Sequence, residues 1–201
     1  MNGPNMLTMY RICTIPFIVI LLSFDFPQPY AYTAAMLLFL SSGITDIIDG
    51  RMARKHNQVT DFGKFMDPLA DKMLVCATLI CFVGMNLLPA WIVIIVVARE
   101  FAISGIRQLA SEKGAVISAN GWGKFKTYLQ DSLAVCIMLI LMCDFPAAWE
   151  GLYLSVEGDP TWLSMFFGIY ANVAVWLMLA ITLLSLYTYI RDNKSAFGTE
   201  F

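Results

Sequence analysis

Residues 45–73 read TDIIDGRMARKHNQVTDFGKFMDPLADKM, a polar stretch between two apolar runs of the chain. It contains four aspartates at helical spacing: Asp46 and Asp49 are three residues apart, and Asp67 and Asp71 are four apart. On a helix each pair shares one face, because residues three or four apart are neighbours there. The 17 residues between the two pairs are few enough to return the chain antiparallel. We therefore expect two helices whose four carboxylates converge.

The composition of the chain predicts a membrane environment for these carboxylates. Of 201 residues, 59% are hydrophobic and only 14% are charged, which is outside the usual range of soluble domains. Runs that approach the roughly 20 apolar residues of a membrane-spanning helix occur at 11–24, 30–48, 69–88, 89–110, 127–145 and 163–190. The fold expected is an all-α integral membrane protein, a six-transmembrane-helix bundle that forms a single domain over residues 1–197. Residues 198–201 are expected to be a cloning remnant.

The distribution of charge predicts the orientation of this bundle. With six spans, both termini and the segments after spans two and four share one side, and all 13 Lys and Arg residues fall there. The opposite segments carry acidic residues only, among them Asp144, Glu150 and Asp159. Because basic residues are retained on the cytoplasmic side, we expect a multi-pass protein of a bacterial cell membrane. Both termini and the aspartates would face the cytoplasm.

The four aspartates require positive charge among them, since clustered carboxylates repel one another and lose hydration near lipid. Oxygen ligands without His or Cys favour a hard divalent cation, Mg²⁺ or Mn²⁺ before Zn²⁺, and four negative charges balance two such ions. Two ions can clamp the attacking and leaving oxygens of a displacement at phosphorus. One alternative stays open, in which the aspartates form salt bridges with basic residues of the same stretch: Arg51, Arg54, Lys64 and Lys72.

The spacing of the polar stretch also resembles a known signature. Asp46-x-x-Asp49-Gly50-x-x-Ala53-Arg54, then after eight residues Gly63-x-x-x-Asp67-x-x-x-Asp71, is similar to the motif of the CDP-alcohol phosphatidyltransferases. The resemblance implies a six-helix membrane fold, a homodimer, and a reaction in which an alcohol displaces CMP from a CDP-linked lipid. It implies that two divalent cations, Mg²⁺ or Mn²⁺, bind to the four aspartates, and that Asp71 also takes the proton of the acceptor hydroxyl. Contacts to CDP-diacylglycerol are implied for Asn5, Thr8, Gly50, Ala53, Arg54, Thr60 and Gly63.

Three further stretches bear on the acceptor alcohol. NGPNMLTMYRICTIP (residues 2–16), ARE with ISGIRQLA (98–100 and 103–110) and GKFKTYLQ (123–130) resemble the branch of the family that uses sn-glycerol 3-phosphate. Basic side chains from two helices would form a pocket for a phosphate dianion. The residues expected in it are Arg99, Arg107, Lys124 and Lys126, with Asp131 as a partner for Arg99 or Lys124. Alternatively, these basic residues only flank the cytoplasmic side of the membrane.

The expected reaction transfers the phosphatidyl group of CDP-diacylglycerol to sn-glycerol 3-phosphate, giving phosphatidylglycerophosphate and CMP in phospholipid biosynthesis. It requires a groove open to lipid, because the acyl chains stay in the bilayer while the nucleotide reaches the cytoplasmic site. No nucleic-acid partner is expected. Two alternatives remain: an acceptor such as inositol phosphate and, from another class, a divalent-cation transporter, which would place its acidic residues near the membrane midplane.

Overall fold

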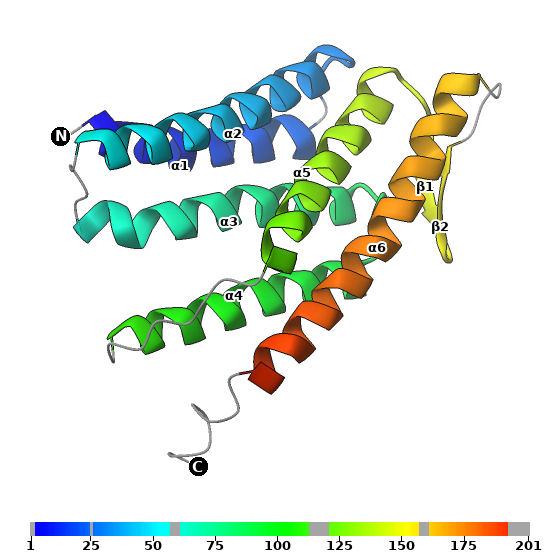
Figure 1. Ribbon diagram of the computed structural model, residues 1–201. Helices are drawn as coiled ribbons and strands as arrows, with labels where there is room; N and C mark the ends of the chain where they lie inside the picture. Colours follow the sequence, from blue (N-terminus) through cyan, green and yellow to red (C-terminus); the bar gives the residue numbers. More distant parts are fainter. Residues whose placement is uncertain (1–2, 25, 57–60, 113–120, 157–160, 193–201) are drawn as a thin grey trace.

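The computed structural model describes residues 3–24, 26–56, 61–112, 121–156 and 161–192. Within these ranges, the description leaves out the side chains of residues 3–7, 46–56, 61–65, 67–68, 71, 109–112, 121–124 and 192. The described residues form six helices and one two-stranded sheet (Figure 1). In chain order these are α1 (Gly3–Ser23), α2 (Tyr30–His56), α3 (Asp61–Gly84), α4 (Ala90–Glu112), α5 (Gly121–Met142), β1 (Ala147–Glu150), β2 (Tyr153–Val156) and α6 (Trp162–Asp192).

Each helix corresponds to one of the predicted apolar runs, and the largest difference lies in the polar stretch. Helix α2 continues past the apolar run to His56, and α3 begins before its apolar run at Asp61, so both aspartate pairs lie on helices as their spacing predicted. Apolar runs mark only the part of a helix that faces hydrocarbon or core. Met52, Ala53 and Arg54 are strong helix formers, so the helix persists into the polar sequence.

Two helical segments among the described residues are long and apolar enough to cross a membrane, Phe125–Met142 and Trp162–Arg191. The apolar segments Thr8–Ser23, Tyr30–Thr45 and Lys72–Gly84 are shorter. Helix α6 also presents an outward apolar stripe, since the side chains of Phe166, Ile169 and Val173 are 59%, 62% and 59% exposed. Large exposed apolar surfaces mark contacts with lipid or with other proteins. The protein is therefore mostly helical, and its described part has two helices that could span a membrane.

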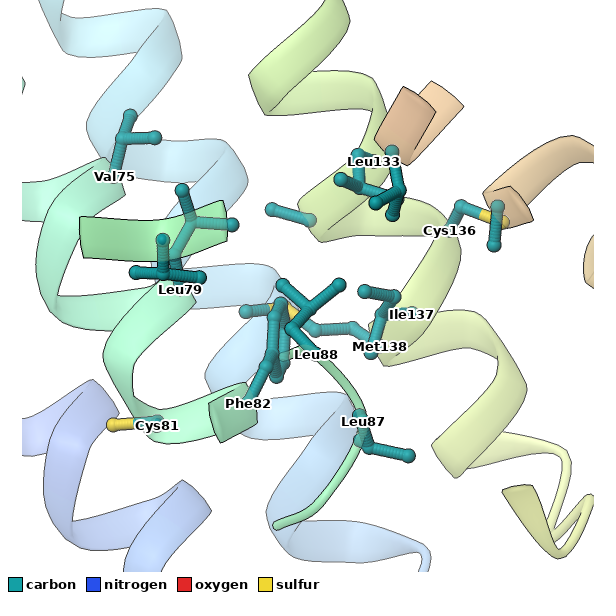
Figure 2. Packing of buried hydrophobic residues seen from close by; sticks show 14 of the residues in the cluster. Val75, Leu79, Cys81, Phe82, Leu87, Leu88, Leu133, Cys136, Ile137 and Met138 are labelled. Atoms are coloured by element: carbon teal, nitrogen blue, oxygen red, sulfur yellow. The ribbon is translucent and has the colours of Figure 1, made fainter. Parts of the chain in front are cut away.

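Helix α5 links the two halves of the molecule. Helix α1 packs against α2 and α3, whereas α5 packs against both α2 and α6. Figure 2 shows Leu79 and Phe82 of α3, with Leu88 just after it, facing Ile137 and Met138 of α5. All five side chains are buried. This apolar centre fixes α5 between the α1–α3 group and α6.

The carboxyl-terminal ends of α3 and α5 are closed by the same backbone motif. Asn86 and Asp144 have φ angles of 57° and 55°. The next amide in each case donates to a carbonyl five residues back, Leu87 to Phe82 at 2.8 Å and Phe145 to Ile140 at 3.1 Å. These are the six-to-one bonds of Schellman motifs. Both helices therefore end sharply, and α4 starts back from Ala90.

A β-hairpin stands where the sequence reading expected a loop, and here the all-α expectation does not hold. Its strands pair antiparallel, and its two-residue turn begins with Gly151 at a φ of 63°, as a type II′ turn requires. The Asn172 side chain of α6 accepts from the Leu154 amide at 2.6 Å and donates to its carbonyl at 2.9 Å. The Trp149 amide donates to the Asn86 carbonyl at 2.7 Å. The hairpin thus fastens α6 to the α3–α4 turn.

We expect Asn172→Ala to lower the free energy of unfolding by about 1–3 kcal/mol, because both backbone groups of Leu154 lose their partner. Thermal unfolding of the detergent-solubilised protein measures this change. The matched control is Ser155→Ala, which removes an exposed hydrogen bond to Glu150 and should have little effect. An unchanged melting temperature for Asn172→Ala would mean that this amide does not anchor the hairpin.

Candidate active site

The backbone places the two aspartate pairs at matching depths on consecutive helices. Asp46 lies ten residues before the end of α2, and Asp71 lies ten residues after the start of α3. At 1.5 Å per residue, both are about 15 Å from their helix ends. Four residues join those ends, which lie together at the left of Figure 1, and such a link spans at most about 18 Å. Asp49 and Asp67 form the corresponding pair nearer the ends.

The side chains of these four aspartates lie outside the description. The same holds for Asn5, Gly50, Ala53, Arg54 and Gly63, and Thr60 is not among the described residues at all. Among the side chains that are described, no group of three or more His, Cys, Asp or Glu residues could hold a metal ion. The fit of a metal therefore rests on donor chemistry and backbone position. Four carboxylates at paired depths on adjoining helices suit hard divalent cations.

A groove of about 1010 Å³ begins close to the first aspartate pair. Its walls come mainly from α2, α5 and α6, and Ser42, Gly43 and Ile44 line it directly before Asp46. One part of the lining is polar and consists of Arg11, Ser42, Thr127, Asp131 and Ser132. The rest is mostly apolar and includes Phe39, Leu40, Leu74, Val75, Val135, Leu139, Phe166 and Phe167. The groove can therefore hold a ligand that is polar at one end and hydrocarbon elsewhere.

Hydrogen bonds between α1 and α2 shape the polar part of the groove. The Thr14 hydroxyl donates to the Arg11 carbonyl at 2.8 Å and lies 2.8 Å from the Ser42 hydroxyl. The Arg11 side chain lines the groove although it is only 1% exposed. Thr8, one of the predicted substrate contacts, is buried one turn earlier on α1. Of the predicted contacts to the lipid substrate, it is the one whose side chain the structure describes.

A second polar cluster joins α4, α5 and α6, and it contains two of the predicted acceptor residues. Oε1 of Glu100 accepts from the Arg99 guanidinium at 3.3 Å and from the Lys126 ammonium group. Nε and NH2 of Arg99 both donate to the Ser185 hydroxyl, at 3.0 and 2.6 Å. The side chains of Lys126 and Arg99 are only 1% and 10% exposed. Lys126 is therefore buried and Arg99 largely so, and both cations are held by neighbouring helices.

The other predicted acceptor residues are placed differently. Arg107 is exposed, two turns along α4, and is close enough to Arg99 to interact with it electrostatically. Lys124 starts α5, but its side chain lies outside the description. Asp131, the expected partner of Arg99 or Lys124, instead lines the groove together with Arg11. Its predicted pairing with Arg99 finds no support, because the hydrogen bonds described for Arg99 reach Ser185 and Glu100.

A further contact connects this cluster to the aspartate-bearing helix. The Lys72 ammonium group, next to Asp71 on α3, donates to the Ser104 hydroxyl of α4. That hydroxyl donates in turn to the Glu100 carbonyl at 2.6 Å. The alternative role of Lys72, a salt bridge with the aspartates, stays untested because their side chains lie outside the description. These contacts connect polar residues of α3, α4, α5 and α6.

Sequence reasoning missed Glu100, Ser104 and Ser185 as members of the site. Glu100 stood next to a predicted binding residue, and one carboxylate among several cations in a membrane helix is a recognisable signal. Ser185 had a weaker signal, since Thr182, Ser185 and Thr188 repeat every three residues on the otherwise apolar α6. The contact of Ser185 with Arg99 spans 86 residues, and no local pattern predicts such a pair.

Comparison with known proteins gives one family match and a consistent set of relatives. The model of the CDP-alcohol phosphatidyltransferase family matches residues 1–184, a range that contains the whole aspartate signature. A CDP-diacylglycerol--glycerol-3-phosphate 3-phosphatidyltransferase of Bacillus subtilis is 37% identical, over 99% of this chain and 98% of its own. Proteins of the same description from Rickettsia bellii and Sodalis glossinidius are 32% and 36% identical, over 98% and 85% of this chain and 97% and 94% of their own.

We expect Ser185→Ala to lower the free energy of unfolding by about 1.5–3 kcal/mol, because two N–H groups of a buried guanidinium lose their acceptor. Ser185→Thr, which keeps the hydroxyl, is the matched control and should retain most of the stability. Thermal unfolding in detergent distinguishes the two. Equal melting temperatures for Ser185→Ala and the parent would contradict the role assigned to this contact.

Proposed function

The chain belongs to the CDP-alcohol phosphatidyltransferase family, and from this we propose that it transfers the phosphatidyl group of CDP-diacylglycerol to sn-glycerol 3-phosphate. The products are phosphatidylglycerophosphate and CMP. The observation that carries the proposal is the near full-length match to relatives described by this activity. The prediction made from the aspartate signature is thereby confirmed at the level of family and reaction.

The aspartates take the central part of the proposed mechanism. Asp46, Asp49, Asp67 and Asp71 would hold two divalent cations, Mg²⁺ or Mn²⁺, and their backbone positions on α2 and α3 support a shared site. Bound cations would neutralise the pyrophosphate of the substrate and make the attacked phosphorus more electrophilic. The carboxylates themselves would fix where the pyrophosphate sits. Their four negative charges would balance two divalent ions.

The transfer step exchanges one P–O bond for another. The acceptor hydroxyl oxygen attacks the phosphorus that carries diacylglycerol, and the bond from that phosphorus to the oxygen of CMP breaks. The hydroxyl proton passes to the carboxylate of Asp71, which acts as general base. The oxygen that stays with CMP keeps the electron pair of the broken bond, and it becomes part of the phosphate group of the released CMP. Asp71 is the one aspartate to which we assign both cation binding and proton transfer.

The nucleotide end of the substrate would lie along the signature. Gly50 and Ala53 allow a ring and a pyrophosphate to approach the backbone, while Arg54 and Thr60 supply directional hydrogen bonds. Gly63 starts the second half of the signature on α3. Asn5 and Thr8 on α1 complete the proposed contact set, and buried Thr8 lies beside the polar end of the groove.

The groove supports a lipid substrate in particular. It leads from residues next to Asp46 to apolar side chains such as Leu139 and Phe166. CDP-diacylglycerol suits such a groove, because its acyl chains favour apolar surroundings while its phosphates need polar partners. We therefore assign the groove to the lipid part of CDP-diacylglycerol. The nucleotide would then meet the aspartates at the polar end.

The acceptor phosphate would bind at the basic cluster of α4, α5 and α6. Arg107 is exposed and offers the first contact, whereas Arg99 and Lys126 lie deeper. Lys124 at the start of α5 completes the proposed set. A phosphate dianion suits several converging cations, of which the arginines can bind it through two N–H groups.

We propose a six-span arrangement with both termini and the site on the cytoplasmic side of the membrane. The basic residues support it, since all 13 fall on one side of six spans. In Figure 1 the amino end of α1, the carboxyl end of α2 and the amino end of α3 share one side, opposite to the hairpin. A homodimer, as in the family, is proposed with it.

An acceptor panel tests the proposed reaction with the purified protein and CDP-diacylglycerol. We expect sn-glycerol 3-phosphate to release CMP fastest, because the cluster supplies cations for its phosphate. Arg107→Ala should raise the KM for this acceptor about tenfold or more through loss of a charge-assisted contact, with little change in the KM for CDP-diacylglycerol. Faster turnover with inositol phosphate or serine would overturn the assignment of the acceptor.

Gly43→Leu tests the groove without disturbing the fold. A Cβ added at Gly43 would meet no atom within 4 Å, and Gly43 lines the groove. The variant should therefore fold normally and raise the KM for CDP-diacylglycerol by roughly tenfold, as expected for displacing one or two buried methylene groups. Gly84→Leu at the outer end of α3, where an added Cβ also has open space, is the matched control. Parent-like kinetics of Gly43→Leu would remove the groove from substrate binding.

The aspartates should separate by role. Asp71→Asn should largely keep binding of CDP-diacylglycerol while transfer falls on the order of 10²-fold or more, as on losing a general base. Asp46→Asn should lose metal and nucleotide affinity together, and added Mg²⁺ or Mn²⁺ should restore part of the activity. Calorimetric binding of a CDP-lipid at several metal concentrations, with turnover alongside, measures both. Normal turnover by Asp71→Asn at saturating metal would exclude Asp71 as the base.

A further inference from the structure

Glu100 carries the contact on which the basic cluster depends. A single carboxylate oxygen, Oε1, accepts from Arg99 on its own helix and from Lys126 on α5. Two cations drawn to one oxygen lie within a few ångströms of each other, where like charges repel strongly. The other two hydrogen bonds of the Arg99 guanidinium go to Ser185 on α6. Glu100 is therefore what allows both charges to stay side by side.

The described side chains of the cluster carry an excess of positive charge. Arg99, Lys126 and nearby Arg107 contribute three positive charges and Glu100 contributes one negative charge. Lys124 of the proposed acceptor set adds one more positive charge. A phosphate monoester, which carries about 1.5 to 2 negative charges at neutral pH, would offset a large part of this excess. Without Glu100 the unbalanced positive charge would be larger by one.

The burial of Lys126 adds a second constraint. Its side chain is 1% exposed and bonded to Glu100, so a dissolved anion cannot reach it while that pair stays closed. Arg107 is exposed on the same helix. A phosphate that arrives at Arg107 can reach Lys126 only by replacing the carboxylate as its partner.

We propose that Glu100 is a resident counter-ion of the acceptor pocket, which holds Arg99 and Lys126 together while the pocket is empty and yields them to the acceptor phosphate on binding. This inference rests on the proposed function, because it takes the basic cluster to be the acceptor site. Glu100 is a positioning residue: it acts through Arg99 and Lys126 and sets the net charge that selects a phosphorylated acceptor.

Thermal unfolding of the full chain in non-ionic detergent, with rising concentrations of inorganic phosphate, tests the proposal. Glu100→Gln should melt lower than the parent without phosphate, because it leaves buried cations uncompensated. Phosphate should also raise its melting temperature more than that of the parent, since a ligand that replaces a missing counter-ion stabilises the folded state more. Glu150→Gln is the matched control, because it makes the same substitution at an exposed position of the hairpin at the far end of the molecule. Its melting temperature should respond to phosphate like that of the parent.

Steady-state inhibition gives a readout that a purely structural role would not move. Inorganic phosphate should compete with sn-glycerol 3-phosphate about fivefold or more tightly in Glu100→Gln, because the carboxylate no longer repels the anion. Inhibition constants and phosphate-dependent melting equal to those of the parent would overturn the role of Glu100. If phosphate neither stabilises nor inhibits the parent, the acceptor site lies elsewhere. In that case the proposed acceptor pocket is wrong, and the role of Glu100 fails with it.

Glu100→Asp keeps the test decisive if Glu100→Gln does not fold. The shorter carboxylate retains its charge but cannot reach Lys126 as closely. Phosphate should therefore raise its melting temperature more than that of the parent and should also inhibit it more tightly, because the weaker pair is easier for the anion to replace. A gain from phosphate no larger than that of the parent would contradict the proposal here too.

Discussion

The whole arrangement depends on keeping charge neutral at the edge of a hydrocarbon environment. Carboxylates and basic groups in helices that border lipid are stable only when opposite charge lies beside them. Two solutions stand next to each other in this protein. The aspartates of α2 and α3 are assigned to external divalent ions, whereas the cations of α4 and α5 find Glu100 within the chain. The contact from Lys72 through Ser104 joins α3, which carries one aspartate pair, to Glu100 of the basic cluster.

In the proposed reaction, two substrates of opposite character have to meet. The groove between α2, α5 and α6 offers apolar walls up to the turn that precedes Asp46, and the basic cluster lies across α4 to α6. On the proposed assignment, a lipid would reach the aspartates without leaving hydrocarbon, and a water-soluble phosphate would reach them without entering it. The proposed assignment follows from polarity: the apolar groove suits the acyl chains, and the charged cluster suits the phosphate of the soluble acceptor.

The sequence predicts the architecture well where a local pattern carries it. Apolar runs predicted the helices, and the aspartate spacing predicted two helices and the family. The apolar runs stop short of Asp49 and start after Asp67, because hydropathy reports environment and not helix propensity, whereas the aspartate spacing correctly placed both pairs on helices. The hairpin was missed because its strands are four residues long and depend on distant partners such as Asn172. The pairing of Arg99 with Ser185 and the shape of the groove likewise arise from packing between helices far apart in sequence. The positions of the signature side chains stay predictions.

The last helix contributes to the groove, to the basic cluster and to the hairpin, and this has a consequence for the order in which the protein is made. Helix α6 supplies Phe166 and Tyr170 to the groove, Ser185 to Arg99 and Asn172 to the hairpin. The aspartate signature leaves the ribosome more than a hundred residues before α6 is complete, and chains fold from the amino terminus as they are synthesised. A nascent chain therefore carries the chemical groups of the reaction long before it has a wall for the lipid or a fixed Arg99. On the proposed assignment of the groove and of Arg99, we expect incomplete chains that lack α6 to leave the lipid precursor unconsumed.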